Sequence, residues 1–235
     1  MRLAAVGDVH LTPGREGSVR AHLGDLGQRA DVLLLAGDLT DWGLVEEAEI
    51  VAREFADLPV PVVAVLGNHD HEGDRPGAVA DQLRAGGITV LEGEGAVVPI
   101  GQQRLGVAGV KGFGGGFPDA CGSAFGEREM KVFMERSAHD AAALENALHS
   151  LDADRRVALT HYAPVPGTLR GENRELYPFL GAHLLAEAID ASTPSLAVHG
   201  HAHGGTENGA TAGGVPVRNV ARPVLGRPYA VYEVD

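Results

Sequence analysis

The sequence predicts an α/β fold in which a parallel sheet is followed by antiparallel strands, with two sheets packed face to face. Two observations support this prediction. Over residues 2–66, apolar runs of strand length alternate with segments of helical periodicity, the pattern of a parallel sheet with crossover helices. Over residues 88–110, short apolar runs are separated by glycine turns, which is typical of hairpins.

The first part of the chain predicts three parallel strands joined by helical segments. Segment 43–57 is amphipathic, because apolar side chains recur on one helical face and glutamates occupy the other. Pro59 and Pro61 end this helix. The expected elements are, in order, a strand at 2–6, helical content at 16–30, a strand at 31–36, the helix at 43–57 and a strand at 62–66.

The rest of the chain predicts a hairpin-connected region and then further strands and helices. The expected elements are a helix at 76–85, antiparallel strands at 88–91, 96–100 and 105–110, a helix at 127–150, a strand at 156–160, a helix at 181–190, a strand at 195–198, and closing antiparallel strands at 215–220 and 229–234. A glycine-rich loop, 111–126, and a proline-containing loop, 163–180, lie between them, and we expect the second to be ordered over the ligand crevice. No linker-like composition divides the chain, so we expect one domain, 1–235.

Composition restricts the partners of this chain. Its 19 basic and 32 acidic residues give a formal net charge of −13, which argues against long nucleic acid as a ligand but leaves small phosphorylated substrates open. The single cysteine, Cys121, excludes an intramolecular disulfide. The apolar start at 2–6 is too short for a signal peptide, and no segment approaches the roughly 20 apolar residues of a membrane span. We expect a cytoplasmic protein without membrane association; nothing in the sequence indicates its oligomeric state.

Five polar blocks follow apolar runs that are predicted strands. In parallel sheets the ligand crevice lies outside the carboxyl ends of the strands, which is where these blocks fall. In an extended segment alternate residues point to one side, so Asp8 and His10 can reach the same cation, and His201 and His203 repeat this spacing. The blocks together supply seven candidate metal ligands: Asp8, His10, Asp38, Asn68, His161, His201 and His203.

The ligand types indicate which metals would bind. Two carboxylates, one amide and four imidazoles form a mixed oxygen and nitrogen set, which suits Mn²⁺, Fe²⁺/Fe³⁺ or Zn²⁺ better than Ca²⁺ or Mg²⁺. Seven ligands are too many for one ion with an open position, whereas two ions fit if one carboxylate bridges them. Two-metal sites of this kind generate a hydroxide and stabilise the oxygens of a displaced phosphoryl group.

In their order along the chain, the blocks Asp-x-His, Gly-Asp-x-x-Asp, Gly-Asn-His-Asp, His and Gly-His-x-His resemble the calcineurin-like metallophosphoesterase superfamily, and specifically its small, single-domain bacterial members. The resemblance implies a four-layer α/β/β/α sandwich with two mixed sheets. It also implies that one metal is held by Asp8, His10 and His203, the other by Asn68, His161 and His201, and that Asp38 bridges them together with the hydroxide that attacks phosphorus.

The same resemblance implies roles for three further residues. His69 is not a ligand in the family pattern; it stabilises the phosphoryl oxygens and can protonate the leaving group. Asp70 would orient the His69 ring, as a carboxylate orients the imidazole of a catalytic triad. Asp41 would support a metal-binding histidine by hydrogen bonding.

Other candidates have weaker signals. Arg170, Asn173 and Arg174 in the 163–180 loop could hold a second part of the substrate, and the alternative is a solvated loop. His71 could lie at the rim of the site or in a solvated loop. Lys111 and Phe113 are weaker candidates. Trp42 could lie at the mouth of the crevice or anchor the core. The remaining histidines suggest surface or structural positions: His22, His139, His149, His183 and His199.

The predicted function is that of a phosphohydrolase dependent on two metal ions, in which a metal-activated hydroxide attacks a phosphate ester. A phosphodiesterase of small or nucleotide-like substrates is favoured, because a proton-donating His69 helps a poor leaving group to depart. The alternatives are a phosphomonoesterase, a nuclease, or a catalytically silent scaffold protein. Each block standing alone would be read as an ordinary turn, and it is the ordered set that favours the metal site.

Overall fold

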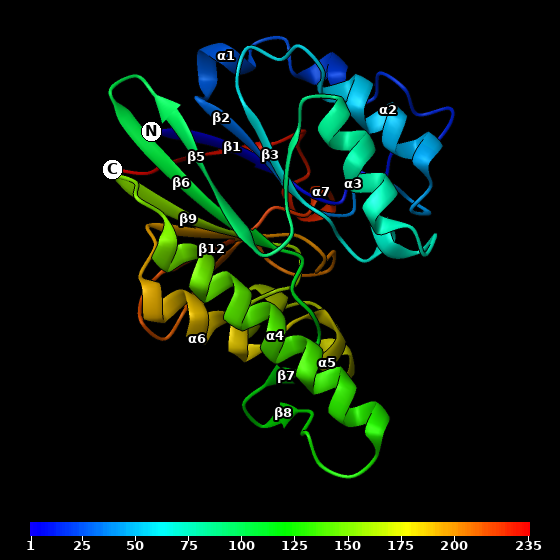
Figure 1. The fold of residues 1–235 in the computed structure, drawn as a ribbon, viewed down its shortest axis with the longest axis vertical. Coiled ribbons are helices and arrows are strands. Elements are labelled where there is room, and N and C mark those ends of the chain that lie inside the picture. Colours follow the sequence, from blue (N-terminus) through cyan, green and yellow to red (C-terminus); the bar gives the residue numbers. More distant parts are fainter.

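Two mixed β-sheets pack face to face, and each is covered by helices on its outer side (Figure 1). The computed structural model describes residues 1–235. The first sheet has the strand order β13-β1-β2-β3-β4, in which β1 to β4 are parallel and β13 is antiparallel to β1. Its strands are β1 (Arg2–Val6), β2 (Val32–Ala36), β3 (Val62–Val65), β4 (Thr89–Leu91) and β13 (Ala230–Glu233).

The second sheet has the strand order β11-β12-β10-β9-β6-β5. Strands β6, β9, β10 and β12 are parallel, and the outer strands β5 and β11 are antiparallel to their neighbours. Its strands are β5 (Glu94–Ile100), β6 (Gln103–Val110), β9 (Arg155–Thr160), β10 (Leu196–His199), β11 (Asn208–Ala210) and β12 (Pro216–Asn219). A separate small hairpin pairs β7 (Gly116–Phe117) with β8 (Ala120–Cys121).

Helices form the two outer layers. In Figure 1, α2 and α3 lie against the first sheet, whereas α4 and α6 lie against the second, and the N-terminal end of α4 projects from the body beside β7 and β8. The helices are α1 (Leu26–Arg29), α2 (Val45–Phe55), α3 (Pro76–Ala85), α4 (Arg128–Ser150), α5 (Tyr177–Leu180), α6 (His183–Ser192) and α7 (Arg222–Leu225). Single 3₁₀ turns are η1 (Arg20–His22), η2 (His69–His71), η3 (Pro166–Leu169) and η4 (Arg174–Leu176).

The burial pattern of β2 explains why the layers stack in this order. All five of its residues are buried, as a central strand covered on both faces requires. Leu33 and Leu35 belong to the core shared with α2 and α3, whereas Val32 and Leu34 belong to the core between the two sheets. A third core, which includes Leu144 of α4, joins the second sheet to its helices. The four-layer α/β/β/α prediction is therefore confirmed.

Two local predictions differ from the structure. Segment 88–91 forms β4, which is parallel to β3 and not antiparallel, because α3 acts as a crossover that returns the chain in the same direction. Segment 215–220 contains β12, which is parallel to β10, since the unpredicted strand β11 reverses the chain before it. The helical content expected at 16–30 is present as the short η1 and α1. None of the helices combines the length and apolar character that crossing a bilayer requires.

Candidate metal centre

The loops that follow β1, β2, β3, β9 and β10 bring the candidate ligands together at one edge of the sandwich. Parallel strands β1 and β2 end side by side, and their loops stay paired, because the backbone amide of Asp8 donates to the Gly37 carbonyl (2.9 Å) and that of His10 to the Asp38 carbonyl (3.1 Å). The turn η2 follows β3 and starts directly after Asn68. The second sheet contributes the residues after β9 and β10. Both sheets therefore supply side chains to one place.

Four of the seven candidate ligands have an uncommon backbone conformation. Their φ angles are positive: 59° at Asp8, 44° at His10, 49° at Asp38 and 69° at His201. Residues with a Cβ rarely adopt this region, and such conformations cluster at functional sites, where the surrounding structure enforces them. The positive φ angles at four candidate ligands therefore support a functional site here.

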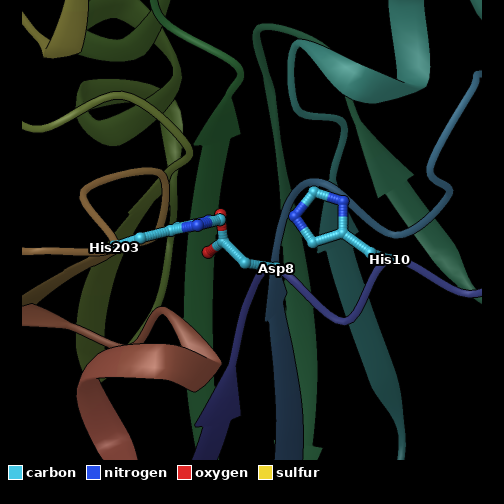
Figure 2. A group of neighbouring side chains, drawn as sticks. All are labelled: Asp8, His10 and His203. Carbon is cyan, nitrogen blue, oxygen red and sulfur yellow. The ribbon is translucent and has the colours of Figure 1, made fainter.

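Asp8, His10 and His203 form the first group (Figure 2). One candidate ligand atom from each lies within 4.8 Å of the others. His203 Nε2 is 2.8 Å from Asp8 Oδ1, and the backbone amide of His201 donates to both Asp8 oxygens at 3.0 Å. In Figure 2 the Asp8 carboxylate lies between the two imidazoles, which come from opposite sides. The spacing is suited to a single metal ion.

The second group consists of Asn68, His161 and His201. His161 is fully buried, and its Nδ1 donates to the Ala36 carbonyl oxygen at 2.8 Å. Since that nitrogen carries the proton, Nε2 faces Asn68 Oδ1 at 2.9 Å and Asp38 Oδ1 at 3.2 Å. His201 Nε2 donates to the Phe179 carbonyl oxygen at 3.3 Å, which leaves Nδ1 as the ligand nitrogen. A backbone carbonyl that fixes the tautomer is a usual support for a metal-binding histidine.

Asp38 lies between the two groups and is almost completely buried. One carboxylate oxygen, Oδ1, is 3.2 Å from His161 Nε2, and the other, Oδ2, is 3.9 Å from His10 Nε2. Its Oδ1 also accepts a hydrogen bond from the His69 backbone amide at 2.9 Å. Each carboxylate oxygen of Asp38 thus faces one of the two groups, which is the position that a bridging ligand needs.

The electrostatics of the pair agree with this geometry. Burial tends to raise the pKa of Asp38, but the adjacent His161 charge outweighs it and holds that pKa well below its usual range. Burial likewise opposes the charged form of His161, yet Asp38 raises the pKa of its imidazole to about 9. Burial lowers the pKa of His201 to about 3, so this ring is neutral at physiological pH. The carboxylate is therefore ionised and ready to bind a cation.

Two observations test whether a metal fits here: the hydrogen bonding of His10, and the glycines that lie against the two carboxylates. Nε2 of His10 is buried and makes no hydrogen bond, whereas Nδ1 faces Asp41 Oδ1 at 3.3 Å. Buried polar atoms without a partner are rare and call for an explanation, which a metal ion supplies. A Cβ on Gly67 would overlap the Asp38 carboxylate, and one on Gly200 would overlap that of Asp8. The residues present therefore fit a pair of metal ions, and glycine is required where the loops approach the carboxylates.

The structure places His69 beside the first group, but it corrects the expected role of Asp70. The ring of His69 is 4.5 Å from that of His10, and its Nδ1 donates to the backbone carbonyl of Asp41 at 2.8 Å. Asp70 does not contact the His69 ring. It is fully buried and accepts hydrogen bonds from the backbone amides of Thr40 (2.8 Å) and Gly67 (2.7 Å), because its side chain points inward beneath the loops after β2 and β3. Asp70 therefore positions those loops, and Asp41 orients His69.

Asp41 also reaches the first group through its side chain, since its Oδ1 is 3.3 Å from His10 Nδ1.

The expected substrate residues divide into two sets. His71 lines a hollow beside Asn68. Arg170, Asn173 and Arg174 are exposed, and none is hydrogen-bonded or ion-paired to the candidate ligands; the Asn173 side chain instead caps η4 by accepting from the Glu175 amide. Their loop nevertheless lies against the residue after His203, because Glu172 accepts a hydrogen bond from the Gly204 amide at 2.6 Å.

One supporting residue was not predicted. Asn219, at the carboxyl end of β12, is fully buried, and its Nδ2 donates to the Ala202 carbonyl at 2.8 Å, which holds the segment between His201 and His203. The sequence carried a signal for it. Asn219 lies near the end of the predicted strand 215–220, much as Asp38 and Asn68 lie just after predicted strands. His199 also packs into the structure, with Nε2 2.9 Å from the Thr168 hydroxyl.

Comparison with known proteins agrees with this architecture. A family model described as calcineurin-like phosphoesterase matches residues 1–205. No curated protein matches the chain significantly in sequence. Among solved structures, phosphopantetheinyl hydrolase (PptH) from Mycobacterium tuberculosis is similar, with a TM-score of 0.68 and 17% identity over 99% of this chain and 96% of that one.

Two further structures share the fold. TT1561 of Thermus thermophilus gives a TM-score of 0.55 at 18% identity, covering 100% of this chain and 99% of that one. A structure from Staphylococcus aureus described as a 5'-nucleotidase has a TM-score of 0.58 at 15% identity, covering 93% of this chain and 48% of that one. The strand-end ligand set, the four layers and the family match over most of the chain lead to one conclusion: this chain belongs to the calcineurin-like phosphoesterase family.

Proposed function

We propose that the protein hydrolyses phosphate esters with the help of two metal ions, and that small or nucleotide-like phosphodiesters are its preferred substrates. The observation that carries the proposal is the position of Asp38 between two groups of ligands, one on each side of its carboxylate. A single structural metal would need only one of these groups, whereas a bridged pair needs both.

The protein residues would divide the work between holding the metals and handling the substrate. Two bound ions of the manganese, iron or zinc type would supply a hydroxide nucleophile near neutral pH and stabilise charge on the phosphoryl oxygens. Asp8, His10 and His203 would hold one ion, and Asn68, His161 and His201 the other. Asp38 is shared, and its burial strengthens every interaction that it makes with a cation.

His69 is placed to act on the substrate. Its Nδ1 proton is engaged by the Asp41 carbonyl, so Nε2 is the nitrogen that can exchange a proton with a leaving-group oxygen. The side chain is 41% exposed, which leaves it accessible from the solvent side of the site. A proton donor matters most for a poor leaving group such as an alkoxide, and this favours esters of ordinary alcohols, the proposed diesters among them, as substrates.

The test is hydrolysis of bis(4-nitrophenyl) phosphate and 4-nitrophenyl phosphate by manganese-loaded protein. We expect turnover of both and a larger kcat/KM for the diester. Asp38→Ala should reduce turnover at least ~10³-fold, because it removes the shared ligand. His69→Ala should reduce turnover of an alkyl ester about 10²–10⁴-fold, and that of the nitrophenyl esters less, while the metal content stays unchanged. Failure to hydrolyse either ester, in protein shown by elemental analysis to contain two metals, would refute the proposal.

A further inference from the structure

A trough runs from the second ligand group along the N-terminal half of α4. Its inner part, of about 220 Å³, is lined by Asn68, His71, Lys111, Phe113, Arg136 and Tyr162. Its outer part, of about 670 Å³, is an open hollow that shares Phe113 and Arg136 and adds Phe133. The inner part therefore begins at a candidate metal ligand, Asn68, and the outer part continues it toward solvent.

A row of aromatic rings forms one wall of this trough. The Tyr162 ring is 4.4 Å from that of His201, Phe113 is 5.8 Å from Tyr162, and Phe133 is 5.1 Å from Phe113. The row thus starts in contact with a candidate metal ligand and ends on α4. Phosphate chemistry gives no reason for an apolar wall here, but the organic part of an ester does.

Lys111 is the charged group at the inner end, and it lacks a charged partner. Its Nζ lies 4.8 Å from the centre of the Tyr162 ring and 4.9 Å from that of Phe113, and its one hydrogen bond is to the Gly112 carbonyl (3.0 Å). The nearby carboxylate, Asp140, is paired with Arg136 through Oδ1, which is 2.9 Å from Arg136 Nε; its Oδ2 is buried without a hydrogen-bond partner, and no carboxylate lies within ion-pair distance of Lys111 Nζ. A partly buried ammonium is costly to desolvate unless an anion pairs with it.

Arg136 faces the same space from α4. Its Nε is ion-paired with Asp140 Oδ1, one helical turn further along, and its side chain is half exposed. The guanidinium keeps donors that can face a ligand, in the planar arrangement that suits carboxylate and phosphate oxygens. Lys111 and Arg136 thus both line the inner hollow, in a chain whose net charge is −13.

We propose that Lys111 and Arg136 form a second anion subsite, and that the substrate is a phosphate ester carrying a second anionic group, with its organic part lying along Phe113 and Phe133. This inference rests on the proposed function, because it takes the phosphate under attack to lie at the metal centre. The second anion can be a phosphate or a carboxylate, since both bind the same donors.

Binding of small alkylphosphonates tests the subsite without turnover, because their P–C bond is not hydrolysed. The probes are propylphosphonate, propane-1,3-bisphosphonate and 3-phosphonopropionate, titrated calorimetrically into manganese-loaded protein at constant free manganese. We expect the two doubly functional probes to bind at least about tenfold more tightly than propylphosphonate, which is the effect of one charge-assisted contact. If only the bisphosphonate does so, the second group is a phosphate; if both do, a carboxylate also serves.

Matched variants locate the effect. Lys111→Met should abolish the preference for the bisphosphonate while leaving the affinity for propylphosphonate unchanged, which also shows that the variant is folded. Lys131→Met removes the only other lysine of the chain, on the exposed surface of α4, and should change neither. Arg136→Gln, which can still hydrogen-bond to Asp140, should weaken the preference from the other wall.

The outcomes separate the two proposals. The subsite is refuted if wild-type protein shows no preference, if Lys111→Met retains it, or if Lys131→Met loses as much. A third outcome supports the subsite and counts against the proposed hydrolase function: wild-type protein does not hydrolyse nitrophenyl esters but prefers the bisphosphonate, and Lys111→Met loses that preference.

Discussion

The four imidazoles around Asp38 differ in how strongly each holds a proton. Burial lowers the pKa of His10 and of His201, so both rings are neutral at pH 7. The pKa of His203 is raised by its hydrogen bond to Asp8, and that of His161 is raised to about 9 by Asp38, which outweighs burial. A histidine binds a metal only in its neutral form. Metal and proton therefore compete at His161 and His203.

This competition predicts that metal affinity rises with pH. Because the pKa of His161 is raised to about 9, the metal must displace its proton below that pH and need not do so above it. We expect the affinity for Mn²⁺ to increase about tenfold or more between pH 7 and pH 8, as the release of at least one proton requires. Calorimetric titration at both pH values, in two buffers of different ionisation enthalpy, measures the affinity and the number of protons released. An affinity independent of pH would contradict the assignment of His161 as a ligand.

In the metal-free protein the same pair contributes to stability in the opposite sense. The folded-state pKa of His161 lies above its ordinary value of 6.5, so the ion pair with Asp38 stabilises the fold fully below pH 6.5 and loses its effect as the pH rises through about 9. Metal-free protein should therefore become less stable over the range in which metal binding becomes tighter.

At the scale of the element, each ligand-bearing loop depends on how closely it can approach its neighbour. The loop after β3 passes so near Asp38 that Gly67 has no room for a side chain, and the loop after β10 passes as near to Asp8 at Gly200. Asp70 reinforces the first of these approaches by accepting hydrogen bonds from the Gly67 amide and from Thr40. The strands set the direction of each ligand, and these tight loops set its position.

Gly67→Ala should therefore damage the metal centre. The new methyl group would overlap the Asp38 backbone and carboxylate, so we expect Mn²⁺ affinity to fall at least about tenfold, because one displaced ligand costs this much. The matched control is Gly77→Ala in α3, where an added Cβ meets nothing within 4 Å. That change should leave metal binding intact and stabilise the helix by about 0.5–1 kcal/mol. Equal metal affinity in the two variants would show that the close approach at Gly67 is unimportant.

At the scale of the whole molecule, the candidate ligands tie the two sheets together. Asp8, His10, Asp38 and Asn68 follow strands of the first sheet, and the three other histidines follow strands of the second. The sheets also share the apolar core between them, so the fold does not depend on metal alone. A metal pair would nevertheless bind the folded state and have no comparable site in the unfolded chain.

Metal loading should accordingly stabilise the whole fold. At free manganese about 100 times the dissociation constant, the expected gain is about 2.7 kcal/mol. For a chain of this length, that gain corresponds to a rise in Tm of roughly 5–10 °C. Differential scanning calorimetry with and without a chelator measures it. Asp38→Ala should melt at the same temperature with or without manganese, and an equal manganese response in that variant would show that the ions bind elsewhere.

The candidate ligands could be predicted from the sequence because each follows an apolar strand, and parallel strands deliver their carboxyl ends to one edge. The uninterrupted apolar runs of β2 and β3 likewise predicted central strands, and all residues of both strands are buried. Strand direction was harder to predict outside this region. Whether β4 and β12 run parallel or antiparallel depends on α3 and on the short strand β11, whose three residues have too weak a pattern to detect.

The sequence by itself determined which side chains can bind metal and the fold that presents them, because ligand chemistry and strand periodicity are both local properties of the chain. Only the tertiary structure decided that Asp41 and not Asp70 orients His69, and that Lys111 and Arg136 line one hollow beside the ligand site. Lys111 and Arg136 are distant along the chain. His69 and Asp70 are neighbours whose side chains point in different directions. Their geometry follows from how the loops and α4 pack, which no local pattern of residues specifies.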